Sequence, residues 1–114
     1  MKKICVDIDG VICFTKKNLY KNSKANYKVI ETINRLYDEG HFILIYTARF
    51  MGRNHDNATL AKKKGYKFTK TQLNKWGLKF HKIYFGKPSS DLYIDDKNLN
   101  FKSNWVQDLK KILK

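Results

Sequence analysis

Acidic residues stand at the ends of two apolar runs of the chain. Asp7 and Asp9 close a short β-branched run, and Asp95 and Asp96 directly follow another. Because Asp7 and Asp9 are two residues apart on an extended segment, their side chains start on the same side, and Gly10 lets the backbone turn sharply after them. One carboxylate of such a pair can attack phosphorus, while the other protonates the leaving oxygen and later activates water. The second pair offers the oxygen ligands that a hard cation such as Mg²⁺ prefers.

A hydroxyl and several basic groups complete this set. Thr47 ends a third apolar run, where its hydroxyl can donate to a phosphoryl oxygen, and Lys87 stands just past a fourth, where it can neutralise charge on a transferring group. Ala48 and Arg49 follow directly, and Arg49 and Arg53 are candidates for binding the rest of a substrate. Singly, each piece also fits an ordinary turn, loop or strand. Together they favour a site for a phosphoryl group held against magnesium.

The apolar runs alternate with segments of helical periodicity. Strands are expected at 3–8, 41–47, 82–85 and 91–94. Helices are expected over 27–40, over 58–64, from Thr69 onward and from Ser103 onward. This alternation predicts a three-layer α/β domain, Rossmann-like, with a mainly parallel sheet. Ligands of such sheets bind outside the carboxyl ends of the strands, where every candidate residue falls.

Particular residues mark the ends of the predicted helices. Asn26 is the expected N-cap of the first, and Gly40 is the glycine expected after its last turn. We expect the second helix to end at Gly65. Thr69 and Gln72 have the spacing of a capping box, which predicts that a separate third helix begins there.

Length and composition limit the class of protein. With 114 residues, the chain is expected to form one domain, 1–114. No stretch approaches the roughly 20 apolar residues that span a bilayer, and the apolar start is broken by Asp7 and Asp9, unlike a secretion signal. We therefore expect a cytoplasmic protein with no membrane partner. Cys5 and Cys13 form neither a disulfide framework nor a metal-binding spacing.

The net charge of +14 is compatible with nucleic-acid binding. However, 21 of the 24 basic residues are lysines, scattered along the whole chain, whereas nucleic-acid sites favour the bidentate geometry of arginine. We interpret the charge as a solvated surface that attracts anionic substrates, and nucleic acid is not the expected partner.

The four motifs, read in order, resemble those of the haloacid dehalogenase (HAD) superfamily of phosphatases. They are Asp-Ile-Asp-Gly-Val, a strand ending in Thr-Ala-Arg, Gly-Lys-Pro, and Tyr-Ile-Asp-Asp-Lys. Residues 71–97 also resemble a small subgroup linked to capsule polysaccharide biosynthesis. The resemblance covers nearly the whole chain. Neither the 10–26 loop nor the 47–87 span is long enough for a cap domain, so the chain is similar to the capless type.

The resemblance implies a role for each motif residue. Asp7 matches the nucleophile, and Asp9 matches the general acid and base, with its backbone carbonyl as a magnesium ligand. Thr47, Ala48 and Arg49 match the phosphate-binding second motif and Lys87 the third. Asp95 and Asp96 match the acidic, metal-binding fourth motif, and which of the two contacts Mg²⁺ directly stays open.

The leading hypothesis is a Mg²⁺-dependent phosphatase that acts on a sugar phosphate or a phosphorylated capsule precursor through an aspartyl-phosphate. One alternative is a phosphatase acting on nucleic-acid ends or nucleotides. Another is a non-enzymatic domain that accepts a phosphoryl group for signalling, against which Asp9 argues. Because a capless site is open, selectivity must come from loops, from a large substrate, or from a neighbouring subunit in a homo-oligomer.

Overall fold

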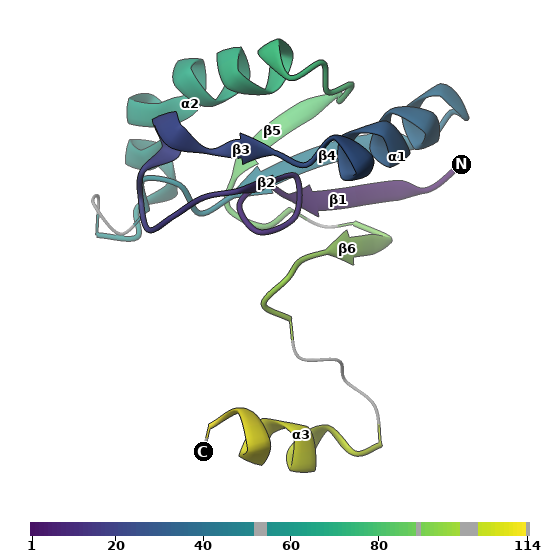
Figure 1. Cartoon of the computed structure of the whole chain (residues 1–114), viewed down its shortest axis with the longest axis vertical. Helices are drawn as coiled ribbons and strands as arrows, with labels where there is room; N and C mark the ends of the chain where they lie inside the picture. Colours follow the sequence, from purple (N-terminus) through teal and green to yellow (C-terminus); the bar gives the residue numbers. More distant parts are fainter. Residues whose placement is uncertain (52–54, 89, 99–102, 114) are drawn as a thin grey trace.

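The computed structural model describes residues 1–51, 55–88, 90–98 and 103–113, so that the candidate Arg53 lies outside the described residues. Its main sheet has four parallel strands in the order β5-β4-β1-β6 (Figure 1). These strands are β1 (Lys3–Asp7), β4 (Phe42–Thr47), β5 (Lys82–Phe85) and β6 (Leu92–Ile94). The α/β class with a parallel sheet is therefore confirmed.

The remaining elements flank this sheet. Strands β2 (Cys13–Phe14) and β3 (Lys24–Ala25) form a small antiparallel pair, and a short 3-10 helix, η1 (Tyr20–Asn22), lies in the loop between them. The helices are α1 (Tyr27–Asp38), α2 (Ala58–Lys75) and α3 (Trp105–Ile112). None of these helices is long and apolar enough to cross a membrane.

The first helix begins and ends where its sequence predicts. The side chain of Asn26 accepts a hydrogen bond from the Val29 N–H, which satisfies one of the free N–H groups of the first turn. After the last turn the backbone reverses at Gly40, whose φ of 94° is accessible to glycine without a steric penalty.

Strand β4 is the centre of the core. Ile43 and Ile45 pack on one face of the sheet with buried side chains of α1 and α2, including Ile33 and Leu73. Leu44 points to the other face, where a second apolar cluster forms. Burial on both faces explains why this strand is apolar almost throughout. It also fixes the register of the strands whose ends carry the candidate residues.

The expected break between two helices at Gly65 is wrong, because α2 runs without interruption from Ala58 to Lys75. Gly65 is buried inside the helix, and the Phe50 ring lies so close that a Cβ atom at Gly65 would overlap it. The glycine therefore serves a close contact and does not end the helix. Thr69 is buried in the helix interior, and Gln72 bonds to other segments, so the capping box does not form.

The last helix differs slightly from its prediction. Its N-cap is Asn104, one residue after the predicted Ser103, and the Asn104 side chain makes no capping hydrogen bond. No described residue of α3 is buried, and the helix lies apart from the sheet in Figure 1. The apolar periodicity therefore predicted a helix correctly, but the apolar face of α3 is not part of the core around β4.

We predict opposite effects of Gly65→Ala in two backgrounds. In the wild type the new methyl group overlaps Phe50, and overpacking costs about 1–3 kcal/mol, more than the roughly 1 kcal/mol that alanine gains in a helix. In a Phe50→Ala background only the helix gain remains. Urea unfolding should show destabilisation in the first case and stabilisation in the second. Stabilisation in both would contradict the packing role of Gly65.

Candidate active site

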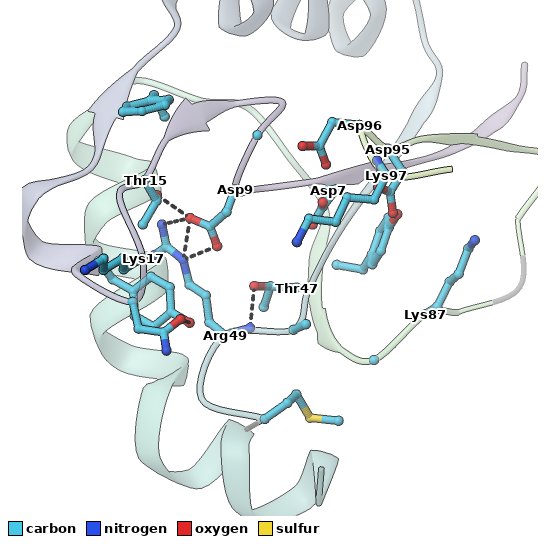
Figure 2. Close-up of a pocket in the computed structure, with 18 residues that line it drawn as sticks. Asp7, Asp9, Thr15, Lys17, Thr47, Arg49, Lys87, Asp95, Asp96 and Lys97 are labelled. Carbon is cyan, nitrogen blue, oxygen red and sulfur yellow. Dashed lines mark hydrogen bonds and ion pairs between the residues drawn. The ribbon is translucent and has the colours of Figure 1, made fainter. Parts of the chain in front are cut away.

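The parallel strands bring their carboxyl ends to one edge of the sheet, where an open cavity of about 700 Å³ lies (Figure 2). The residues predicted to form a site all line this cavity, namely Asp7, Asp9, Thr47, Ala48, Arg49, Lys87, Asp95 and Asp96. The structure thus brings together every predicted residue that it describes. The cavity is also lined by residues that the sequence did not single out, among them Thr15, Lys17, Tyr20, Tyr46 and Lys97.

Three carboxylates form the acidic part of the cavity. Asp7, Asp95 and Asp96 each offer an oxygen, and these atoms lie within 4.8 Å of one another. Burial and the charge of Asp95 raise the pKa of Asp7 from its ordinary value of 3.8 to about 7. A divalent cation would relieve this repulsion. The donor set, all oxygen and all anionic, fits a hard cation such as Mg²⁺.

The two adjacent acids differ in how they are held. Asp95 accepts hydrogen bonds on both oxygens, from the Tyr46 hydroxyl and from the Lys97 N–H at 2.9 Å. Burial alone raises the pKa of Asp95, but these donors hold it below its usual range. Asp96 instead lies so close to Gly10 that a Cβ atom at position 10 would overlap the Asp96 carboxylate. The φ of Gly10 is +92°, a backbone conformation that favours glycine. Gly10 thus provides the turn after β1 and also the space for Asp96.

Tyr46 also lines the cavity, although it belongs to none of the four motifs. Burial, followed by the neighbouring Asp95 carboxylate, raises the pKa of Tyr46, so its hydroxyl keeps the proton that it donates. The sequence carried one usable signal. Side chains alternate along a strand, so Tyr46 lies on the opposite face of the sheet from Thr47. On that face it packs in the same cluster as Tyr93 of β6, and Asp95 directly follows β6.

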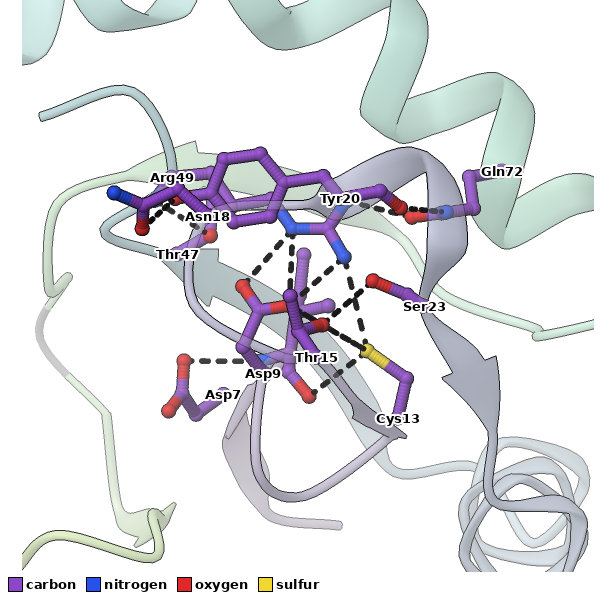
Figure 3. A network of polar contacts seen from close by, with 11 residues as sticks. Asp7, Asp9, Cys13, Thr15, Asn18, Tyr20, Ser23, Thr47, Arg49 and Gln72 are labelled. Carbon is purple, nitrogen blue, oxygen red and sulfur yellow. Dashed lines mark hydrogen bonds and ion pairs between the residues drawn. The ribbon is translucent and has the colours of Figure 1, made fainter. Parts of the chain in front are cut away.

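The Asp9 carboxylate is fixed by a network of donors (Figure 3). The Arg49 Nη2 and Nε atoms lie 2.9 Å from its Oδ1 and Oδ2, respectively, and the Thr15 hydroxyl donates to Oδ1 at 2.5 Å. Burial alone raises the pKa of Asp9, but the hydrogen bonds and charge of Arg49 lower it below its ordinary value. The Cys13 thiol lies 3.5 Å from Oδ1. Asp9 is therefore held in one orientation beside the acidic cluster.

Arg49 lines the cavity, but its guanidinium faces Asp9 and not the open space. The residue is only 1% exposed, and besides Asp9 it donates from Nη1 to Gln72 Oε1 at 2.6 Å. The Tyr20 ring covers one face of the guanidinium, 4.7 Å from its central carbon. The Arg49 guanidinium thus directs no N–H group into the cavity for the predicted contact with phosphate, because its donors pair with Asp9 and Gln72.

Thr47 is well placed for the predicted role. Its side chain is buried at the end of β4, and its oxygen accepts a hydrogen bond from the Arg49 N–H at 3.0 Å. Because the oxygen is already an acceptor, its own hydrogen remains for a ligand in the cavity. The next residue, Ala48, is exposed on the cavity wall.

Lys87 and Lys97 both line the cavity, but their ammonium groups point in different directions. Lys87 lines the cavity, but its ammonium lies 4.4 Å from the centre of the Tyr93 ring and points away from Asp7 (Figure 2). Lys97, in contrast, directs its ammonium into the cavity from the loop after β6. The signal for Lys97 was present, because it directly follows Asp95 and Asp96 at a strand end.

Comparisons with solved structures agree with this fold. The chain is similar to a target protein from Vibrio cholerae, with 26% identity, full coverage of both chains and a TM-score of 0.71. It is also similar to a conserved protein from Bacteroides thetaiotaomicron, with 23% identity, coverage of 99% of this chain and 92% of that one, and a TM-score of 0.55.

A third similar structure is the D,D-heptose 1,7-bisphosphate phosphatase from B. bronchiseptica, complexed with magnesium and phosphate. Here the identity is 17% and the TM-score 0.52, over 99% of this chain and 64% of the phosphatase. These likenesses support a HAD-like fold. No protein-family model and no curated protein sequence matches the chain.

The raised pKa of Asp7 predicts how stability depends on pH without a divalent cation. Between about pH 4 and pH 7 the folded protein retains a proton on Asp7 that the unfolded chain has released. The free energy of unfolding should therefore fall as pH rises through this range, and Asp7→Asn should reduce that slope.

Urea unfolding at pH 5, 6 and 7 in EDTA measures this effect. Added Mg²⁺ should stabilise the wild type more at pH 7 than at pH 5, and Asp7→Asn much less. Equal slopes for the wild type and the variant would show that Asp7 does not carry the shifted proton.

Proposed function

We propose that the protein is a Mg²⁺-dependent phosphatase in which Asp7 is the nucleophile. One observation carries the proposal: Asp7 lies in a cluster of carboxylates at the edge of the sheet, and Asp9 is held beside it in one orientation. The magnesium and phosphate held by the heptose bisphosphate phosphatase support this proposal through a shared fold.

The proposed reaction has two steps, transfer of the phosphoryl group to Asp7 and its hydrolysis by water. An ionised Asp7 oxygen forms a bond to phosphorus while the bond from phosphorus to the leaving oxygen breaks. Asp9 supplies a proton to that oxygen from its protonated form, which is the minor form because burial alone raises the pKa of Asp9 but Arg49 lowers it below its ordinary value. Asp9 then takes a proton from water as the water oxygen attacks the phosphorus. This second attack breaks the bond to Asp7 and releases inorganic phosphate. Thr47 donates to a phosphoryl oxygen throughout.

We assign the metal to Asp7, Asp96 and the backbone carbonyl of Asp9. Asp96 is the better direct ligand of its pair because both oxygens of Asp95 already accept hydrogen bonds from the protein. Asp95 then orients the loop that carries Asp96. When bound, a magnesium ion would offset the negative charge of the nucleophile and of the phosphoryl group.

The lysines of the cavity favour an anionic substrate. Lys97 directs its ammonium toward the position where the phosphoryl group must lie to reach Asp7, and the charge of Lys87 acts on Asp95. Phe14 of β2 and Lys17 of the loop after β2 also line the cavity. We infer a small phosphorylated metabolite, namely a sugar phosphate or a phosphorylated capsule precursor, as the resemblance of residues 71–97 suggests.

Phosphate release tests the proposal. The substrates are a panel of sugar phosphates, nucleotides and a 3′-phosphorylated oligonucleotide, each assayed with Mg²⁺ and with EDTA. We expect release that needs Mg²⁺, is abolished by Asp7→Asn, and falls about 10²–10⁴-fold in Asp9→Asn. The matched control is Asp38→Asn, which removes an exposed carboxylate paired with Lys79 on the surface and should leave the rate unchanged.

Release that persists in Asp7→Asn would contradict the proposed mechanism. A stable phosphoryl group on Asp7 without turnover would favour the signalling alternative, and a preference for the oligonucleotide would favour the nucleic-acid alternative.

A further inference from the structure

We propose that Gln72 is a positioning residue, which acts through Arg49 to orient Asp9 and at the same time anchors the loop that forms one wall of the cavity. The part that concerns Asp9 rests on the proposed function. Arg49 thereby has a role different from phosphate binding, and a residue of α2 belongs to the catalytic arrangement although Gln72 lies outside the four phosphatase motifs.

The Gln72 amide uses both of its ends (Figure 3). Its Oε1 accepts from Arg49 Nη1 at 2.6 Å, and its Nε2 donates to the backbone carbonyl of Tyr20 at 2.7 Å. Only an amide side chain presents an acceptor and a donor side by side in this way. Gln72 thus connects three segments, one after β4, one in the loop between β2 and β3, and α2 itself.

Arg49 has no nitrogen without a partner. Nε and Nη2 donate to Asp9, and Nη1 donates to Gln72. The guanidinium is planar and rigid, so contacts at both ends leave it one orientation, and Tyr20 covers its face. The orientation of Asp9 therefore follows from that of Arg49, which in turn follows from Gln72.

The same contacts hold the loop. The Tyr20 ring packs against Phe50 with ring centroids 5.1 Å apart, and its carbonyl bonds to Gln72. The loop also reaches Asp9 directly, because the hydroxyl of Thr15 bonds both to Asp9 and to Ser23. Loss of the Gln72 amide should therefore loosen the loop and disturb Asp9 together.

Three variants separate these two effects. Gln72→Met keeps the size of the side chain but loses both hydrogen bonds, whereas Gln72→Glu keeps an acceptor for Arg49 and loses the donor to Tyr20. We expect Gln72→Met to lower kcat about 10–10²-fold, the cost of a small misplacement of a catalytic group, with a smaller change in KM. Gln72→Glu should retain more of kcat. Thr71→Ala, at the exposed neighbouring position on α2, is the matched control and should match the wild type.

A second measurement does not depend on turnover. The loop between β2 and β3 carries Lys16, Lys17 and Lys21, so limited trypsin digestion reports its attachment. Both Gln72 variants should be cut faster in this loop than the wild type and Thr71→Ala. Thermal melts establish that each variant is folded at the assay temperature.

Arg49 itself gives a chemical test. If it positions Asp9, Arg49→Ala should lose kcat, and added guanidinium ion should restore part of it while KM for the substrate stays nearly constant. A large rise in KM with kcat retained would instead identify Arg49 as a phosphate ligand and overturn this part.

Wild-type kcat and wild-type digestion in Gln72→Met would overturn the inference while leaving the phosphatase proposal intact. Absence of activity in the wild type would count against the phosphatase alone, because faster cleavage of the loop in the Gln72 variants would still establish Gln72 as its anchor.

Discussion

Mutual repulsion among carboxylates is the constraint on which the site depends. Carboxylate oxygens of Asp7, Asp95 and Asp96 lie close together. They do so because β1 pairs in parallel with β6, which aligns Val6 with Ile94 and places the acids that follow side by side. A fold would not gather these charges for stability, since burial next to like charge makes ionisation costly. The buried core around β4 holds the strands in register, and a cation is the simplest partner that makes the arrangement favourable.

Asp9 lies two residues from Asp7 but in a different electrostatic environment. Arg49, almost fully buried, neutralises Asp9 and fixes its orientation, whereas Asp7 faces other acids. Two carboxylates at one strand end thereby acquire different electrostatic environments, with the pKa of Asp7 raised and that of Asp9 lowered. The cost of burying a guanidinium is offset by the hydrogen bonds on all of its nitrogens.

Local patterns predicted much of this structure. Residue type and short-range spacing predicted the central strand at 41–47, which the structure has at Phe42–Thr47, and the Asn26 cap. The motif residues converge because strand ends in a parallel sheet share one edge. The roles that the sequence did not reveal depend on contacts between distant residues. Gly65 alone indicates a helix end. Its actual role, to leave space for the Phe50 ring, depends on a residue 15 positions earlier in the sequence.

The same limit applies to the site. Arg49 pairs with Asp9 across 40 positions, and Gln72 bonds to Tyr20 across 52. No local pattern encodes such partners. Lys87 and Lys97 follow strand ends equally well in the sequence, and only the course of the two loops decides which ammonium enters the cavity. Sequence therefore located the chemistry, while the fold determined which side chain performs each part.

A crystal structure with Mg²⁺ and beryllium trifluoride, a mimic of a phosphoryl group on a carboxylate, tests the central claim most directly. We expect the mimic to be bonded to an Asp7 oxygen, with Mg²⁺ in contact with Asp7 and Asp96 and with Arg49 still paired with Asp9. A mimic bound to Arg49, with Asp7 unmodified and no metal among the carboxylates, would contradict it.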